Sequence, residues 1–193
     1  MYGQILFDRA IEQAWKKVAK NKGASGIDGV TIDAYKLNED ENPRKLLQKL
    51  RDKEYKPTPV RRVYIPKKNG DRRPLGIPNL EDRIVQQAIV DRLQPKFEEH
   101  IFHKWSCGYR PNMGVERAMQ IILWNIETGC NYIYDADIKS FFDNIPHKKM
   151  MGVLNQYVAD GTVLDLVWEW MKSGYMEEGK HVIANSGTPQ GGL

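Results

Sequence analysis

The segment from Val60 to Ile77 constrains the fold most strongly, because it carries the pattern of a β-hairpin. Two runs of strand-forming residues flank Asn69-Gly70, a dipeptide that strongly favours a two-residue turn between antiparallel strands. Pro66 and Pro74 each remove a backbone N–H donor from these runs. We therefore expect a hairpin at the edge of a sheet rather than a central pair of strands.

Positive charge is concentrated around this hairpin. Between Lys56 and Arg83 there are eight basic and three acidic residues, a net charge of +5, whereas the whole chain of 193 residues carries +4. A positive block in an otherwise nearly neutral chain indicates contact with a polyanion. The alternative is an ordinary solvated charged surface. The basic residues are Lys56, Arg61, Arg62, Lys67, Lys68, Arg72, Arg73 and Arg83.

The remaining patterns mix helices and strands without regular alternation, which predicts the α+β class. A glycine-rich turn is expected at 23–29. Asn79 is expected to cap the helix that follows it, with Asp82 bonding back to the cap. Tyr157 is expected in the core and Asp160 at a helix end. Expected helices span 5–20, 42–50, 79–93, 153–158 and 163–171, with a strand at 131–138 and a second hairpin at 175–183.

Composition excludes some classes of protein. No run of about 18 apolar residues occurs, so we expect no membrane span. The two cysteines, Cys107 and Cys130, favour a reducing cytosol over a disulfide framework. His100, His103 and Cys107 lack a fourth ligand nearby, which disfavours a zinc site.

Two acids at the end of the expected strand 131–138 are candidates for chemistry. Asp135 and Asp137 point to the same side of such a strand, because side chains alternate along it. Carboxylates are costly to bury unpaired, and a divalent metal ion offsets that cost. Hard oxygen ligands on a rigid strand are typical of Mg²⁺ sites. The alternative is a solvent-exposed strand end.

A second candidate is the loop from Ser186 to Gly192. Its glycines allow the backbone to approach a ligand closely, and Gln190 offers an amide for contact with a base or sugar. Considered alone, it also fits an ordinary glycine-rich loop.

Taken in order, these segments resemble the reverse transcriptase domain of bacterial group II intron-encoded proteins, from about residue 5 to the last residue. Retron, diversity-generating and CRISPR-associated reverse transcriptases share the later motifs. The amino-acid sequences at 73–78 and 82–88 favour the group II branch. The motifs are Gly23-Ala24-Ser25-Gly26-Ile27-Asp28-Gly29, Tyr55-Lys56-Pro57, Arg61-Arg62-Val63, Ile65-Pro66-Lys67, Arg73-Pro74-Leu75-Gly76-Ile77-Pro78, Asp82-Arg83-Ile84-Val85-Gln86-Gln87-Ala88, Gly108-Tyr109-Arg110-Pro111, Asp137-Ile138-Lys139-Ser140-Phe141-Phe142-Asp143 and Gly187-Thr188-Pro189-Gln190-Gly191-Gly192.

The resemblance implies a catalytic role for Asp137, which would bind two Mg²⁺ ions together with the backbone carbonyl of Ile138. Asp135 is not a ligand in the family. Phe142 matches the aromatic residue that packs under the sugar and rejects a ribose 2′-hydroxyl.

The resemblance also implies contacts to substrates. Lys67 and Arg73 match the cations that grip the triphosphate, and Gln190 matches a glutamine beside the incoming nucleotide. Arg110 belongs to a motif whose role is template contact or fold support. The other expected contacts to the nucleic-acid backbone are Arg61, Arg62, Lys68 and Arg72.

The implied architecture is a right-hand polymerase, with fingers at 1–90 and 148–185 and palm at 91–147 and 186–193. The family's Y-x-D-D motif lies beyond Leu193, so we expect this chain alone to be inactive as a polymerase. The parent protein is expected in the bacterial cytoplasm, with intron RNA template, DNA primer and dNTP as partners. The alternative is a non-catalytic RNA-binding module that assists splicing, the maturase role.

Overall fold

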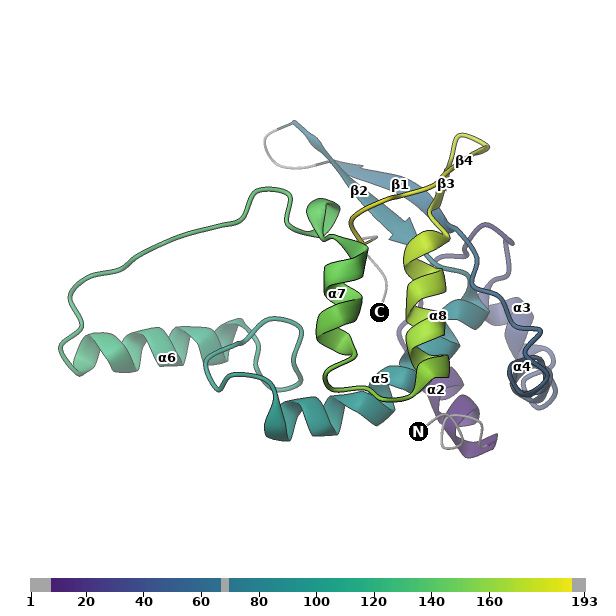
Figure 1. The fold of residues 1–193 in the computed structure, drawn as a ribbon, viewed down its shortest axis with the longest axis horizontal. Helices are drawn as coiled ribbons and strands as arrows, with labels where there is room; N and C mark the ends of the chain where they lie inside the picture. Colours follow the sequence, from purple (N-terminus) through teal and green to yellow (C-terminus); the bar gives the residue numbers. More distant parts are fainter. Residues whose placement is uncertain (1–7, 67–69, 189–193) are drawn as a thin grey trace. The chain divides into compact units, whose positions relative to one another are not determined.

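The computed structural model describes residues 8–66 and 70–188, whose contacts divide them into two units. The first unit contains the described residues up to Asp91 and those from Ser140 onward, and the second contains Arg92–Lys139. Figure 1 shows a mixture of helices and short strands. The predicted α+β class is confirmed.

The described strands of the first unit form one small sheet in the order β2-β1-β3-β4. β1 (Val60–Pro66) pairs antiparallel with β2 (Arg72–Ile77), and β3 (Tyr175–Glu177) pairs antiparallel with β4 (Lys180–Val182). A parallel contact between β1 and β3 joins the two hairpins. The antiparallel strand pairing of both predicted hairpins is confirmed, whereas Asn69 of the predicted two-residue turn lies outside the described residues. Segments far apart in the sequence share one sheet.

The prediction of an edge hairpin is correct for β2 and wrong for β1. β2, which contains Pro74, is an outer strand of the sheet. β1 lies inside the sheet, where Val60 and Arg61 pair with β3. Pro66 stands at the opposite end of β1, beyond the residues that pair with β3. Its missing N–H therefore removes no bond from the β1–β3 pair.

Helices provide most of the apolar core of the first unit. They are α2 (Asp8–Lys20), α3 (Ile32–Lys36), α4 (Asn42–Arg51), the first part of α5 (Leu80–His100), α7 (His147–Leu154) and α8 (Gly161–Lys172). α2 packs against α4, and α7 runs beside α8 (Figure 1). The fully buried apolar residues are Ile11, Ala14, Leu46, Leu80, Ile84, Val85, Val158 and Val163.

The junction between α7 and α8 differs from the prediction of one helix over 153–158. α7 ends at Leu154, and a turn follows. Asp160 begins α8 instead, because its carboxylate accepts hydrogen bonds from the backbone N–H groups of Thr162 and Val163. Tyr157, expected in the core, is 49% exposed.

The second unit contains α6 (Val115–Glu127), none of whose residues is buried. The predicted strand at 131–138 is wrong for this structure, since the segment has no regular secondary structure and Tyr132 and Tyr134 are exposed. A strand is held by backbone hydrogen bonds to a neighbouring strand. No described strand pairs with this segment, so its alternating pattern alone does not produce a strand.

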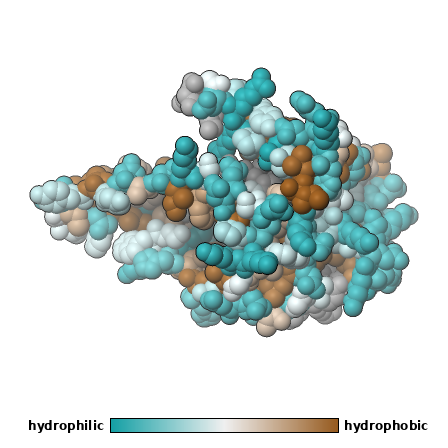
Figure 2. All heavy atoms as spheres, turned by 45° about the horizontal axis from the view of Figure 1, so that its top comes forward, coloured by the Kyte–Doolittle hydropathy of each residue, from teal (hydrophilic) through white to brown (hydrophobic). Residues whose placement is uncertain are grey.

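Surface hydropathy is mixed. Figure 2 shows a face on which hydrophilic residues predominate and hydrophobic residues form small separate groups. Within the described part of the chain, no helix combines the length and the apolar character needed to cross a membrane.

Candidate nucleotide and nucleic-acid site

The register of the β1–β2 hairpin divides its four described arginines between two faces of the sheet. Arg62 and Arg72 lie on one face of the sheet. Arg72 pairs with Pro66, and Pro66 lies on the same face as Arg62 because every second residue of a strand points to the same side. Arg61 and Arg73 lie on the other face by the same alternation. The hairpin thus offers cations on both faces rather than one continuous basic surface.

A cleft of about 420 Å³ opens along the Arg62 face. The guanidinium carbon of Arg62 lies 3.5 Å from the centre of the Tyr175 ring, a cation–π contact between β1 and β3. Asp143 and the segment 182–188 form other parts of the lining. Small-molecule sites occupy about 300–1,000 Å³, so the cleft has a size that accommodates a nucleotide-sized group.

Backbone hydrogen bonds join the segment that contains Phe142 to the glycine-rich loop beside this cleft. Thr188 donates its backbone N–H to the carbonyl oxygen of Phe142 at 2.8 Å, and Gly187 donates to that of Ile145 at 2.8 Å. Gly187 has a φ of +83°, and a Cβ placed there would lie 2.7 Å from the Asp143 carbonyl oxygen. Only glycine fits this position without displacing the backbone. The structure therefore brings together two features that the sequence places 45 residues apart, 142 and 187.

Three predicted contact residues, Lys67, Lys68 and Gln190, lie outside the described residues. Lys67 and Gln190 were predicted to contact the incoming nucleotide, and Lys68 the nucleic-acid backbone. Arg73, also predicted to contact the incoming nucleotide, is exposed in β2. The contacts of these side chains with substrate remain predictions.

Asp137 and Ile138 belong to the second unit, in the irregular segment 131–138. Asp137 is exposed, and Ile138 is 69% exposed. A carboxylate and a backbone carbonyl are hard oxygen donors, which suit a divalent cation. Among the described residues, however, no three His, Cys, Asp or Glu side chains come together as a metal site. The donor types fit the expected ion, but the described donor set is incomplete.

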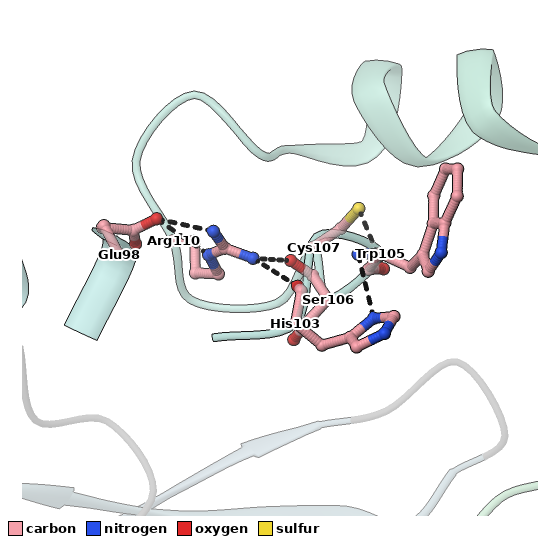
Figure 3. A network of polar contacts seen from close by, with 6 residues as sticks. All are labelled: Glu98, His103, Trp105, Ser106, Cys107 and Arg110. Carbon is pink, nitrogen blue, oxygen red and sulfur yellow. Dashed lines mark hydrogen bonds and ion pairs between the residues drawn. The ribbon is translucent and has the colours of Figure 1, made fainter. Parts of the chain in front are cut away.

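Arg110, also in the second unit, ties the end of α5 to the following loop (Figure 3). Its Nε and Nη2 donate to one Glu98 carboxylate oxygen at 3.0 and 2.7 Å. Its Nη1 donates to the carbonyl oxygens of His103 and Ser106 at 2.8 and 2.7 Å. The side chain is 8% exposed, and the bond to Glu98 raises its pKa. Of the two roles left open for Arg110, the geometry favours fold support.

Asp82 forms a buried polar centre that the sequence did not reveal. It is 2% exposed, and its carboxylate accepts hydrogen bonds from the Tyr55 hydroxyl, the Thr58 hydroxyl and Trp170 Nε1. Burial raises the pKa of Asp82, and burial together with the nearby Asp82 raises the pKa of Tyr55. The predicted bond from Asp82 back to the helix cap is wrong, because the carboxylate instead accepts hydrogen bonds from α8 and from the segment before β1.

Asn79 and Arg83 hold the glycine-rich turn at 23–29. Asn79 Oδ1 accepts a hydrogen bond from the backbone N–H of Ile27 at 2.8 Å. The side chain that was expected to cap the following helix therefore binds a turn far away in the sequence. Arg83 Nη2 donates to the carbonyl oxygen of Ala24 at 2.8 Å, and burial lowers the pKa of Arg83. A Cβ on Gly26 would lie 2.1 Å from Asn79 Oδ1. The adjacent charges of Asp82 and Arg83, directly before the apolar residues Ile84 and Val85, are the sequence feature that could have indicated buried polar contacts here.

Comparisons with known proteins agree with these motifs. Residues 65–193 match the family described as reverse transcriptase (RNA-dependent DNA polymerase). Protein YkfC of Escherichia coli K12 is 34% identical over 189 residues, which cover 95% of this chain and 49% of YkfC. Group II intron-encoded protein LtrA of Lactococcus lactis subsp. cremoris is 37% identical, covering 100% of this chain and 32% of LtrA. The chain thus spans about half of one relative and about a third of the other.

A solved structure, the Cas6-RT-Cas1--Cas2 complex, is similar with a TM-score of 0.60 over 97% of this chain and 19% of that chain. The two sequences are 20% identical, so this likeness shows the fold alone. The predicted resemblance to group II intron-encoded proteins is confirmed by the family match and by LtrA. The chain belongs to the reverse transcriptase (RNA-dependent DNA polymerase) family.

Proposed function

We propose that this chain supplies the fingers and the first part of the palm of an RNA-directed DNA polymerase of the group II intron type. Residues 1–90 and 148–185 are assigned to the fingers, and residues 91–147 and 186–193 to the palm. The substrates are an RNA template, a DNA primer and deoxynucleoside triphosphates. The observation that carries the proposal is the family match across residues 65–193.

The chain's own residues have distinct tasks in this proposal. Phe142 packs against the sugar of the incoming nucleotide and excludes a 2′-hydroxyl by its bulk, which is the group that separates the two nucleotide classes. Arg73 makes forked hydrogen bonds to phosphate oxygens, for which the planar guanidinium is well shaped, and Lys67 contributes a compact charge. The anchored loop before Gln190 supports the proposal by holding its backbone against Phe142.

Asp137 is the proposed catalytic carboxylate. The family generally uses divalent metal ions, and we propose Mg²⁺, held by the Asp137 carboxylate and the Ile138 carbonyl together with further ligands. A bound ion supplies positive charge that stabilises the reacting phosphate. Asp137 contributes a negatively charged oxygen donor from the proposed palm segment, and phosphoryl transfer depends chiefly on positioning and charge.

The test of this function is primer extension on an RNA template by the full-length protein that carries this chain. Asp137→Ala is expected to abolish extension, because one ligand of the metal is lost. Asp135→Ala is the matched control, since it removes an acid from the same segment, and it is expected to retain most of the activity. Extension at the wild-type rate by Asp137→Ala contradicts the assignment.

A second role, binding of structured intron RNA, is supported by the positive block around the hairpin, where Arg72 and Arg73 are exposed. Filter binding by the 193-residue chain between about 50 and 200 mM salt tests it, because each phosphate contact adds about one unit to the salt slope. Arg72→Gln is expected to reduce that slope, whereas Lys45→Gln, on the exposed side of α4, is the control. A flat salt response argues against this role.

A further inference from the structure

His147 is a buried polar residue to which neither the motifs nor the proposed function assigns a task. It begins α7 and is 5% exposed. Its Nε2 lies 2.7 Å from the carbonyl oxygen of Gly187, 40 residues away in sequence. A carbonyl oxygen only accepts, so Nε2 carries the hydrogen. The imidazole and the Trp168 ring of α8 form a T-shaped pair, with ring centres 6.3 Å apart and an interplanar angle of 81°.

The bonded carbonyl belongs to a peptide group with a second attachment. The Gly187 carbonyl and the Thr188 N–H are the two ends of one planar peptide unit. Thr188 N–H donates to the carbonyl oxygen of Phe142 at 2.8 Å. When His147 fixes the direction of the carbonyl, it therefore fixes the direction of the N–H that holds Phe142. Gly187 has a φ of +83°, and glycine adopts many backbone conformations readily, so local backbone preference alone does not fix the direction of this peptide.

We propose that His147 is a positioning residue that sets, through the Gly187–Thr188 peptide, the place of Phe142 against the sugar of the incoming nucleotide. The inference rests on the proposed polymerase function and on the role of Phe142 in sugar discrimination. His147 touches no substrate in this scheme. Its effect is on selectivity, because a small displacement of Phe142 changes the space available for a 2′-hydroxyl.

A purely structural histidine is the alternative, because a buried ring bonded to a carbonyl is common in protein cores. The two possibilities differ in what a substitution changes. Loss of a core residue lowers stability and total activity, whereas loss of a positioning residue changes the ratio of kcat/KM for a deoxynucleotide to kcat/KM for the matching ribonucleotide. This ratio is independent of the fraction of folded enzyme, which makes it the discriminating measurement.

Four variants of the full-length polymerase, two of them controls, separate these possibilities. His147→Leu retains apolar volume but has no donor for the Gly187 carbonyl. His147→Gln restores an N–H donor on a side chain of similar reach. Val163→Ala removes volume from a fully buried site on α8 and serves as a control of lowered stability. Phe142→Ala is the positive control, because it removes the proposed steric barrier itself.

We expect His147→Leu to lower the discrimination ratio about tenfold, the effect of losing one hydrogen bond. His147→Gln is expected to recover most of the ratio, and Val163→Ala to leave it unchanged. An unchanged ratio in His147→Leu overturns the inference while the proposed function stands. An equal fall in Val163→Ala also overturns it. A wild-type protein that extends no primer overturns the proposed function, and with it this inference.

Discussion

Replacement of Asp82 by alanine removes the acceptor at the centre of the buried polar network. The carboxylate accepts hydrogen bonds from the hydroxyls of Tyr55 and Thr58 and from Trp170 Nε1, and Asp82 is only 2% exposed. The three donors come from the segment before β1 and from α8, whereas Asp82 belongs to α5. Asp82→Ala therefore disconnects three parts of the first unit at once.

The expected loss follows from the donors left without an acceptor. Each unsatisfied buried donor costs about 1–3 kcal/mol, but the three share one carboxylate and their contributions do not add independently. Release of a buried charge offsets part of the loss. We therefore expect Asp82→Ala to lower the free energy of unfolding by about 3–5 kcal/mol. For a chain of this size, that corresponds to a fall in Tm of roughly 6–20 °C.

Urea unfolding of the chain, followed by circular dichroism, measures this change through the transition midpoint. Asp82→Asn retains the side-chain volume and one oxygen acceptor, so its loss should be smaller than that of alanine. Asp165→Ala, on an exposed position of α8, is the control and should stay within about 0.5 kcal/mol of wild type. A loss below about 1 kcal/mol in Asp82→Ala refutes the reasoning, because the network then contributes little.

The raised pKa of Asp82 adds a pH dependence with a defined sign. The native carboxyl binds its proton more tightly than the unfolded one, whose ordinary pKa is 3.8. The corresponding stabilisation is complete below pH 3.8 and is lost as the pH rises through the raised native pKa. The difference in unfolding free energy between wild type and Asp82→Asn should therefore decrease with rising pH across that interval. Urea titrations at several pH values test this, and a difference that grows with pH contradicts it.

Two further substitutions test the other structural networks. Gly26→Ala should lower Tm by several degrees, because the added Cβ would lie 2.1 Å from Asn79 Oδ1. Gly108→Ala, with open space around the added Cβ, should leave Tm nearly unchanged. Equal changes of Tm in differential scanning calorimetry contradict this geometry. Arg110→Lys cannot reproduce the paired bonds to Glu98. Limited proteolysis should therefore cut the loop 101–110 faster than in wild type. An unaltered cleavage rate means that Arg110 does not hold the loop.

Local patterns predicted much of the secondary structure of the first unit. The hairpin at 60–77 was predicted from its turn dipeptide, and α2 and α8 from the helical spacing of apolar residues. These signals succeed because turn geometry and helix amphipathicity depend on neighbouring residues. The strand at 131–138 failed for the opposite reason, since a strand depends on a partner that periodicity does not supply.

The candidate site was predicted unevenly. The resemblance singled out Phe142 and the loop at 186–192, and the structure shows that Phe142 and the described part of that loop are bonded to each other. The roles of Lys67, Gln190 and Asp137 remain predictions. His147 was not found from the sequence, because a single histidine at a helix start carries no local signal of the distant carbonyl that it contacts.

By itself, the sequence determined the family, the α+β class and the identity of the motifs, because these depend on the order and spacing of residues. Only the tertiary structure decided what several motif residues do. Asn79 and Asp82, which suit a helix cap locally, bond instead to a distant turn and to α8. The register of β1 against β2 likewise separated Arg62 from Arg73. The physical reason is that a buried polar group bonds to whatever folding brings within about 3 Å, and for Asn79 and Asp82 those partners lie far away in the sequence.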